Sequence, residues 1–375
     1  MTVAAARPVG SRAGGRRRTA RRHAPVGRGD QGAPGWAWGA AHAGDERVAR
    51  HNTTVPGIDL SLDELHLYTS RAEPPAGLAE FWRDAVAEAR GVPAEPELTT
   101  DGPPLRGVRG QRLCFTGLGG ARITGWYLRP EGAGPFPGVV RYHGYGGRAA
   151  RPLEMYTLAA QGFAVLAMDC RGQAGDSEDD ASGTGGGQGW LSRGLLDPRT
   201  LYYRAVYTDA VRALDVLASF PDIDAGRLAV TGMSQGGGLT LAAAALSGRA
   251  SFMWADMPFL CDFPRAVATA TEGPYLEVSD LLRRRPDWEE RVFRSLANID
   301  GANLAPLIRC PAVVSVALWD TICPPSTVFG TFRRLANPDR ELLIYPYHGH
   351  EMPYELEERR LAAFVSRLRG PATGR

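Results

Sequence analysis

The fold is decided by one stretch of the sequence, Arg227-Leu-Ala-Val-Thr-Gly-Met-Ser234-Gln-Gly-Gly-Gly-Leu-Thr-Leu-Ala-Ala-Ala-Ala245. Its apolar, partly β-branched beginning predicts a buried strand, and its alanine- and leucine-rich end predicts a helix. Between them, Gly232-Met-Ser234-Gln-Gly236 has the Gly-x-Ser-x-Gly pattern of a nucleophile elbow. We therefore expect strained backbone at Ser234, a hydroxyl exposed at the tip of the turn, and no room for a Cβ at residues 232 and 236.

The pentapeptide alone is weak evidence. The chain contains 46 glycines, and an ordinary glycine-rich turn before a helix would look the same. The flanking strand and helix favour a nucleophilic serine. The remaining test is whether an acid and a histidine follow Ser234 in the order that such hydrolases use.

Length and composition allow a large core, since 44% of the 375 residues are hydrophobic, in one large domain or two smaller ones. No apolar run reaches the roughly 18 residues of a membrane helix, so no membrane partner is predicted. The five cysteines form no CxxC pair, which predicts reduced, buried thiols in a reducing, cytoplasmic compartment and no disulfide framework or zinc site. These cysteines are Cys114, Cys170, Cys261, Cys310 and Cys323.

Residues 1–55 are rich in glycine, alanine and arginine without a hydrophobic period, which predicts a disordered extension. Arg16-Arg17-Arg18 and Arg21-Arg22 raise two functional interpretations. A twin-arginine export signal lacks the apolar region that must follow it, whereas a nucleic-acid-binding tail needs only charge. We favour a non-functional extension from an upstream start and expect no nucleic-acid partner.

From residue 56 to residue 370, strand and helix patterns alternate. This predicts a single doubly wound, mostly parallel α/β sheet of the α/β-hydrolase fold. A helical insertion at about 258–305 interrupts the alternation where a cap would lie, and residues 371–375 form a tail. The predicted strands are 110–114, 123–128, 138–142, 163–168, 227–231, 252–255, 312–317 and 341–345. One predicted helix begins at Ser61, and the others cover 77–90, 154–161, 199–220, 235–246, 280–284, 288–296 and 354–368.

Three aspartates follow predicted strands and therefore lie at the sheet edge where functional loops gather. Asp169 precedes Ser234 and is out of order. Asp256 ends the strand directly after the elbow, where bonding to loop backbone is its expected role. Asp320 follows a later strand and is the predicted acid.

Two histidines, His348 and His350, follow the last predicted strand, and His350 is the predicted base. The Ser234 hydroxyl is a poor nucleophile unless a base removes its proton during attack. Asp320 would hold the imidazole of His350 in the correct tautomer and stabilise its cation. His143 lies on a different loop and is expected to be a packing residue.

The oxyanion that forms during attack needs two hydrogen-bond donors. The backbone N–H of Gln235, at the start of the helix, is one candidate. The second should come from the loop after the strand 138–142, which contains His143-Gly-Tyr145-Gly-Gly147, so the Tyr145 N–H is the other candidate.

Three blocks in correct order carry a resemblance: Arg171-Gly-Gln173, Gly232-Met-Ser234-Gln-Gly236 and His350-Glu351. With them, the chain from about residue 57 to residue 370 resembles the acetyl xylan esterase / cephalosporin C deacetylase family, carbohydrate esterase family seven. Supporting stretches are His143-Gly-Tyr-Gly-Gly147, Gly194-Leu-Leu-Asp-Pro-Arg-Thr-Leu-Tyr-Tyr203, Pro258-Phe-Leu-Cys-Asp-Phe263 and Asp320-Thr-Ile-Cys-Pro-Pro-Ser-Thr327.

The resemblance implies the same roles for Ser234, Asp320 and His350 and for the N–H groups of Tyr145 and Gln235. It further implies that two residues wall a small acyl pocket and that three hold loops around the site by hydrogen bonds without taking part in the chemistry. The wall residues are Pro274 and Ile322, and the structural residues are Arg171, Gln173 and Glu351.

The function implied by the resemblance is removal of acetyl groups from small O-acetyl esters, such as acetylated xylo-oligosaccharides and cephalosporin C, through an acyl-enzyme. It also implies a homohexamer whose sites face an interior cavity, and no metal or other cofactor. Two alternatives remain open. One is a different α/β-hydrolase, such as a short-chain esterase or a peptidase, and the other is a non-catalytic binding protein with a basic tail.

Two loops depart from the family pattern. The loop Ala174–Gly189 is shorter and more glycine-rich and lacks aromatic residues before Trp190, and the turn after Tyr145 continues as Arg148-Ala-Ala150 where a further glycine is usual. Both loops border the predicted site, so the substrate range is less constrained than the reaction type.

Overall fold

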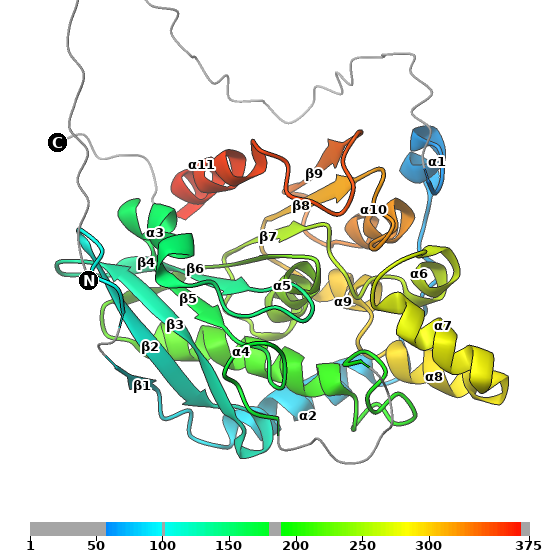
Figure 1. Ribbon diagram of the computed structural model, residues 1–375, viewed down its shortest axis with the longest axis horizontal. Coiled ribbons are helices and arrows are strands. Elements are labelled where there is room, and N and C mark those ends of the chain that lie inside the picture. Colours follow the sequence, from blue (N-terminus) through cyan, green and yellow to red (C-terminus); the bar gives the residue numbers. More distant parts are fainter. Residues whose placement is uncertain (1–57, 100–101, 180–188, 369–375) are drawn as a thin grey trace, which may run out of the picture. The chain divides into compact units, whose positions relative to one another are not determined.

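The elbow stretch lies at the centre of the sheet in the computed structural model, as strand β6 (Ile223–Met233) followed directly by helix α5 (Gln235–Leu246). The structure describes residues 58–99, 102–179 and 189–368. Within them, nine strands form one sheet in the order β1-β2-β3-β5-β4-β6-β7-β8-β9 (Figure 1). The predictions for residues 1–55 and 371–375, and for the loop at 180–188, lie outside the described residues.

The sheet is antiparallel at one side and parallel over the rest. Strands β1, β2, β3 and β5 pair antiparallel, whereas β5, β4, β6, β7, β8 and β9 pair parallel. This confirms the predicted doubly wound, mostly parallel α/β-hydrolase sheet. The other strands are β1 (Glu97–Leu98), β2 (Val108–Thr116), β3 (Arg122–Pro130), β4 (Phe136–Tyr142), β5 (Ala164–Met168), β7 (Phe252–Asp256), β8 (Ala312–Ala317) and β9 (Arg340–Tyr345).

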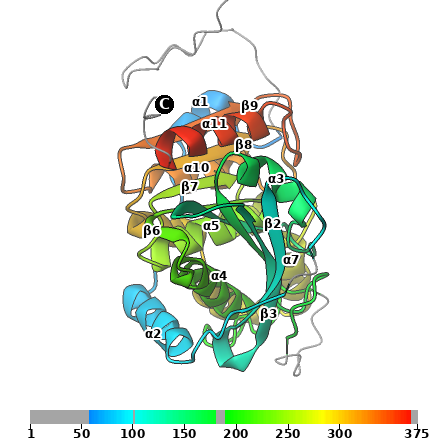
Figure 2. The same ribbon diagram turned by 90° about the vertical axis from the view of Figure 1, so that its left-hand side faces the viewer.

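Both faces of the sheet are covered by helices. Neighbouring residues of a buried strand point to opposite faces, so each face needs its own apolar cover. In β4, Val140 belongs to the hydrophobic cluster that contains α2, α4 and α5, and Val139 belongs to the cluster that contains α3 and α11. The two sets of helices lie on opposite sides of the sheet (Figure 1, Figure 2). Their bounds are α2 (Leu78–Arg90), α3 (Pro152–Ala160), α4 (Tyr202–Ser219) and α11 (Leu356–Leu368).

The remaining helices include the predicted insertion between β7 and β8. Sequence patterns predicted two helices there, at 280–284 and 288–296, whereas the structure has four. The short α6 and α9 and the helix α10 after β8 were missed, because each is under ten residues and two of them begin at proline-rich turns. The bounds are α1 (Leu62–Leu67), α6 (Phe263–Thr269), α7 (Tyr275–Arg284), α8 (Glu289–Leu296), α9 (Gly301–Leu304) and α10 (Pro325–Arg333), with 3₁₀ turns η1 (Leu118–Gly120), η2 (Pro286–Trp288) and η3 (Ala305–Leu307).

The start of α1 agrees with the helix predicted to begin at Ser61 and has a capping box. The Ser61 hydroxyl accepts the Glu64 N–H at 3.4 Å, and the Glu64 carboxylate accepts the Ser61 N–H at 2.8 Å. Among the residues that the structure describes, no helix combines the length and apolar character needed to cross a bilayer.

A buried ion pair joins helix α4 to the loop after β5. The Arg171 Nε donates to Asp209 Oδ2 at 2.7 Å, and its Nη2 donates to Asp209 Oδ1 at 2.8 Å. Both side chains are at most 6% exposed. Asp209 Oδ1 also accepts the Leu118 N–H at 3.0 Å, so the pair holds η1 as well. Such a bidentate pair is directional, and neither charge can be left alone without a large desolvation cost.

We therefore expect Asp209→Asn to destabilise the protein by about 3–5 kcal/mol, because it leaves the buried Arg171 guanidinium without its counter-charge. Thermal and urea unfolding measure the effect. The matched control is Glu290→Gln, which removes the same charge from the exposed pair with Arg294 on α8. That control should change stability by less than about 1 kcal/mol. Equal unfolding midpoints for the two variants would contradict the expectation.

Candidate active site

Ser234 stands between β6 and α5 with backbone angles φ 59° and ψ −120°. A non-glycine residue with positive φ is strained. The turn is also crowded. A Cβ at Gly236 would lie 2.2 Å from the Tyr142 carbonyl oxygen, and one at Gly232 would lie 2.6 Å from it. Both features agree with the predicted nucleophile elbow.

Backbone hydrogen bonds from neighbouring segments hold the strained residue. The Ser234 N–H donates to the Asp256 carbonyl at 2.9 Å, at the end of β7. The Ser234 carbonyl accepts the N–H groups of Gly238 and Phe259, each at 3.0 Å. The elbow therefore depends on β7 and on the segment that follows it, which compensate the local strain.

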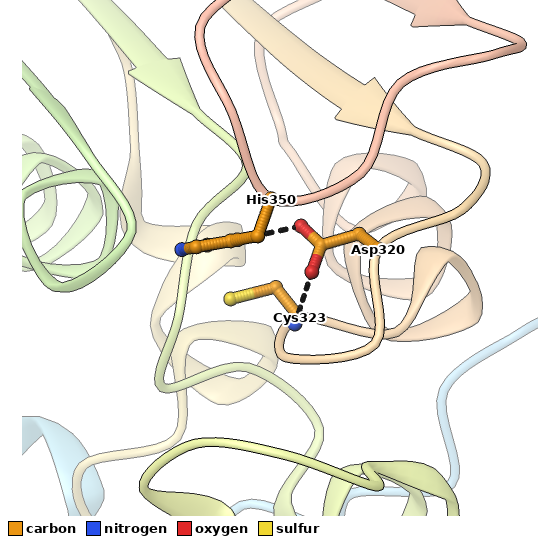
Figure 3. Close-up of side chains that lie close together, drawn as sticks. All are labelled: Asp320, Cys323 and His350. Atoms are coloured by element: carbon orange, nitrogen blue, oxygen red, sulfur yellow. Dashed lines mark hydrogen bonds and ion pairs between the residues drawn. The ribbon is translucent and has the colours of Figure 1, made fainter.

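Asp320 and His350 meet beside this turn, although they follow different strands. Asp320 lies in the loop after β8 and is 1% exposed, and His350 lies in the loop after β9. The His350 Nδ1 donates to Asp320 Oδ2 at 2.7 Å, and its other ring nitrogen points away from the carboxylate (Figure 3). Asp320 Oδ1 accepts the N–H groups of Ile322 and Cys323 at 2.9 and 2.8 Å. These bonds fix the orientation of the Asp320 carboxylate, which in turn fixes the tautomer of the histidine.

Ser234 and His350 line the same cavity, which has a volume of about 1370 Å³. Within the described residues, no hydrogen bond joins the Ser234 hydroxyl to His350. Such contacts are often long without substrate and tighten when it binds. The arrangement therefore brings together the three side chains that the sequence predicted, without a hydrogen bond between Ser234 and His350 in the described part of the chain.

The two predicted oxyanion donors have free N–H groups. Among the residues that the structure describes, the backbone N–H groups of Tyr145 and Gln235 have no hydrogen-bond partner. Gln235 is the first residue of α5, where an N–H has no intrahelical acceptor. The loop that carries Tyr145 is held by the Gly146 N–H, which donates to Gln173 Oε1 at 2.9 Å.

The predicted acyl-pocket residues also lie at this cavity. Pro274, the residue before α7, and Ile322, after β8, both line it. They come from segments that pack closely, because a Cβ at the neighbouring Gly273 would lie 2.7 Å from the Ile322 Cγ2. The insertion therefore supplies one wall of the cavity and the loop that carries Asp320 supplies another.

Two of the three predicted structural residues are buried and hydrogen-bonded. Arg171 pairs with Asp209, as described above. The Gln173 amide donates to Gln235 Oε1 at 2.8 Å and to the Tyr202 hydroxyl at 3.0 Å. Through these bonds and its bond to Gly146, Gln173 links both predicted oxyanion segments without reaching the cavity. Its bonds are those of a structural residue.

Glu351 is the third predicted structural residue. Its side chain is exposed and makes no hydrogen bond within the described part of the chain, where only its backbone N–H bonds to the Gly349 carbonyl at 2.9 Å. The role that the resemblance implies for this side chain, holding a loop by hydrogen bonds, stays a prediction.

The role expected of Asp256 requires a correction. It was expected to bond loop backbone, but its carboxylate is fully buried among side chains. It accepts hydrogen bonds from Trp254 Nε1 at 2.7 Å, Ser315 Oγ at 2.8 Å and Arg360 Nη1 at 2.6 Å. Arg360 lies on α11, so this ion pair ties the last helix to the strand that supports the elbow. The sequence did not reveal the pair, because its partners are 104 residues apart.

Two further histidines were considered from the sequence, His143 and His348, and both contact groups other than Ser234. Both ring nitrogens of His143 are engaged, with Nδ1 2.7 Å from the Gly144 carbonyl oxygen and Nε2 accepting the Cys170 N–H at 2.9 Å. Burial lowers the pKa of this imidazole. His348 packs edge-on against Tyr345, with ring centroids 5.6 Å apart. The interpretation of His143 as a packing residue fits these contacts.

Cys323 is a neighbour that the sequence did not single out as part of the site. It is fully buried next to Asp320 and His350, with the candidate ligand atoms of the three residues within 4.8 Å of one another (Figure 3). Burial raises the pKa of its thiol well above the usual value, followed by the effect of the Asp320 charge. Because metals bind the thiolate, this set fits a carboxylate–imidazole pair better than a metal site. All five cysteines are free thiols.

The chain matches one family model over most of its length and is similar to a known esterase. Residues 55–368 match the family model described as acetyl xylan esterase (AXE1). The chain is 30% identical over 308 residues to the acetyl esterase Axe7A of Xylanibacter ruminicola (strain ATCC 19189 / DSM 19721 / CIP 105475 / JCM 8958 / 23), covering 78% of this chain and 66% of that protein. The match thus spans slightly less than two thirds of that relative.

Two solved structures are similar over almost their whole length. An acetyl xylan esterase from Paenibacillus sp. R4 is 38% identical, with 82% of this chain and 100% of that chain covered and a TM-score of 0.79. Acetyl xylan esterase 1 from Thermoanaerobacterium sp. JW/SL YS485 is 33% identical, with 82% and 98% covered and a TM-score of 0.78.

The strain at Ser234 leads to a stability prediction. Glycine adopts φ 59° and ψ −120° without a Cβ clash, whereas alanine keeps the strain. Since a strained residue costs about 1–3 kcal/mol and glycine loses about 1 kcal/mol through its unfolded-state freedom, Ser234→Gly should be about 1 kcal/mol more stable than Ser234→Ala. Parallel thermal melts measure the stability of each variant directly, whether or not the variant is active. A Ser234→Gly protein that melts at or below the temperature of Ser234→Ala would argue against stored strain.

Proposed function

This chain belongs to the acetyl xylan esterase family and is a carboxylic ester hydrolase, and from that premise we propose that it deacetylates small O-acetyl esters at Ser234. Membership of the family supports acetyl ester hydrolysis. The observation that carries the residue assignment is the Asp320–His350 hydrogen bond of 2.7 Å, at a cavity that also contains the strained Ser234.

In the proposed first step, Ser234 Oγ attacks the acetyl carbonyl carbon while His350 Nε2 takes the hydroxyl proton. The carbonyl π electrons move to oxygen, and the N–H groups of Tyr145 and Gln235 stabilise that charge. His350 then protonates the leaving alkoxide as its bond to the carbonyl carbon breaks. The acetyl group remains on Ser234 as an ester.

In the second step, His350 removes a proton from water, and the water oxygen attacks the carbonyl carbon of the acetyl-enzyme. His350 then returns the proton to Ser234 Oγ as the bond between Oγ and the acetyl carbon breaks, and acetate leaves. Asp320 stabilises the imidazolium in both steps without accepting a proton itself. Its two backbone donors and its bond to His350 support this role, because they hold the carboxylate against the imidazole. No metal or organic cofactor enters the proposed chemistry.

The proposed substrates are acetylated xylo-oligosaccharides and acetylated cephalosporins such as cephalosporin C. Pro274 and Ile322 would limit the acyl group to acetyl or little more, whereas the large cavity leaves room for a sugar or a bicyclic leaving group. The resemblance to the family also leads us to propose a homohexamer, which light scattering tests. Five free cysteines support a reducing, cytoplasmic location.

Ser234→Ala tests the proposed nucleophile. Removing Oγ leaves no atom to accept the acetyl group, so kcat/KM for p-nitrophenyl acetate should fall at least about a thousand-fold. Glu290→Gln, an exposed change on the insertion, should retain wild-type activity. A Ser234→Ala enzyme that keeps more than a few per cent of wild-type activity would exclude the mechanism.

Ile322→Ala tests the acyl pocket. We compare kcat/KM for p-nitrophenyl butyrate with kcat/KM for p-nitrophenyl acetate. Shortening this wall should raise the butyrate-to-acetate ratio about 10-fold, since each methylene is worth about 1–3 kcal/mol in such a pocket. The same assay with aminoacyl p-nitroanilides separates an esterase from a peptidase. Wild-type preference for butyrate or for aminoacyl substrates would contradict the assignment to acetyl esters.

A further inference from the structure

The Tyr145 phenol is a hydrogen-bonding centre for three separate segments. Its hydroxyl donates to Glu277 Oε1 on α7, and its oxygen accepts the N–H groups of Trp190 and Leu191 at 2.7 and 3.1 Å. Glu277 Oε2 accepts the Ser192 N–H at 3.0 Å. A phenol can donate one bond and accept two, so its capacity is filled. The insertion, the Tyr145 loop and the segment 190–192 are therefore held by one shared network.

The surroundings of Tyr145 make this network rigid. The ring packs edge-on against Trp190 and Phe259, with centroids 5.1 and 6.0 Å apart. Burial raises the pKa of the phenol, and the hydrogen bond and charge of Glu277 raise it further, so the hydroxyl stays protonated and remains a donor. A hydrogen bond to an ionised carboxylate is about twice as strong as a neutral one.

The position of Glu277 connects the acyl wall with the oxyanion donor. Its N–H donates to the Pro274 carbonyl at 3.0 Å, so the two residues share the first turn of α7. Both line the cavity. The Tyr145 phenol and the Tyr145 N–H belong to one residue, which means that fixing the ring limits the direction in which the N–H points.

We propose that Glu277 is a positioning residue that aims the Tyr145 N–H at the oxyanion through the Tyr145 phenol. The inference rests on the proposed function, because it assigns a support to the oxyanion donor named there. Gln173 holds the same loop from the core side at Gly146, and Glu277 holds it from the insertion. The insertion thus takes part in stabilising the transition state as well as in walling the cavity.

The test uses Glu277→Gln, Tyr145→Phe and the double variant, with Glu290→Gln as the matched loss of an exposed carboxylate on the insertion. Glutamine keeps the size of the side chain, but its NH2 group would face either the Tyr145 hydroxyl or the Ser192 N–H. Both of these groups donate to Glu277 in the wild-type protein. Phenylalanine keeps the ring and removes only the bonds. Assays with p-nitrophenyl acetate give kcat/KM, and thermal melts report folding.

A pair of ketones separates transition-state binding from ground-state binding. With an aryl trifluoromethyl ketone, Ser234 Oγ adds to the carbonyl carbon, its proton passes to His350, and the carbonyl oxygen becomes an oxyanion. The matching methyl ketone binds without this addition. Losing one oxyanion donor costs about 100- to 1,000-fold, and a donor that is misdirected rather than lost should cost less.

For Glu277→Gln and Tyr145→Phe we expect kcat/KM to fall about 10- to 100-fold. Inhibition by the trifluoromethyl ketone should weaken by a similar factor, and inhibition by the methyl ketone should change less than about two-fold. The double variant should be no worse than Tyr145→Phe alone, because both residues act through one bond.

Three results would overturn the proposal: unchanged kcat/KM in folded Tyr145→Phe, additive losses in the double variant, or equal weakening of both ketones. If Glu277→Gln fails to fold, unchanged kcat/KM in folded Tyr145→Phe still overturns the proposal, because Glu277 is proposed to act only through the phenol. Failure of the proposed function is recognised separately, because then Ser234→Ala would remain active. An inactive Ser234→Ala enzyme with fully active Tyr145→Phe and Glu277→Gln variants rejects only the role of Glu277.

Discussion

The close approach of the elbow to the end of β4 is the constraint on which the site depends. A Cβ at Gly236 would lie 2.2 Å from the Tyr142 carbonyl oxygen, so strand β4, the turn and helix α5 fit together only with glycine at that position. The chain leaves β4 directly into the loop that carries Tyr145. This close contact therefore brings the Tyr145 loop and the start of α5 to one place, where both can face a common oxygen atom.

Buried charges hold the segments around this contact. Arg171 and Asp209 tie the loop after β5 to α4, and Asp256 and Arg360 tie β7 to α11. Apolar packing could fill the same volumes, often with equal or greater stability. The Arg171–Asp209 pair adds a fixed direction through its two hydrogen bonds, and Asp256 is fixed by one bond from Arg360 and by bonds from Trp254 and Ser315. We interpret both pairs as devices that fix the position of neighbouring loops, since Asp256 also accepts the Ser234 N–H through its backbone carbonyl.

The sequence predicted the sheet and the three central side chains because these are encoded locally. Each strand has its own apolar run, and Ser234, Asp320 and His350 follow such runs directly. The role of Asp256 was not predictable in this way, because its partner Arg360 becomes a neighbour only through the tertiary fold. Glu277 was missed for the same reason. It lies in an insertion whose helices are short, and nothing in a stretch of solvated charges marks the one carboxylate that faces inward.

The Tyr145 and Glu277 network also explains how an insertion can alter a hydrolase without altering its central residues. Ser234, Asp320 and His350 are attached to the sheet, and their mutual geometry follows from β6, β8 and β9. The proposed second oxyanion donor, the Tyr145 N–H, is attached to a loop, which needs a support outside the sheet. When that support is a residue on the insertion, helix α7 and the residue before it affect two properties. Pro274 would affect which acyl group fits, and Glu277 would affect the stabilisation of the transition state. Changes in the insertion would then affect substrate range and rate together, because both depend on where α7 begins.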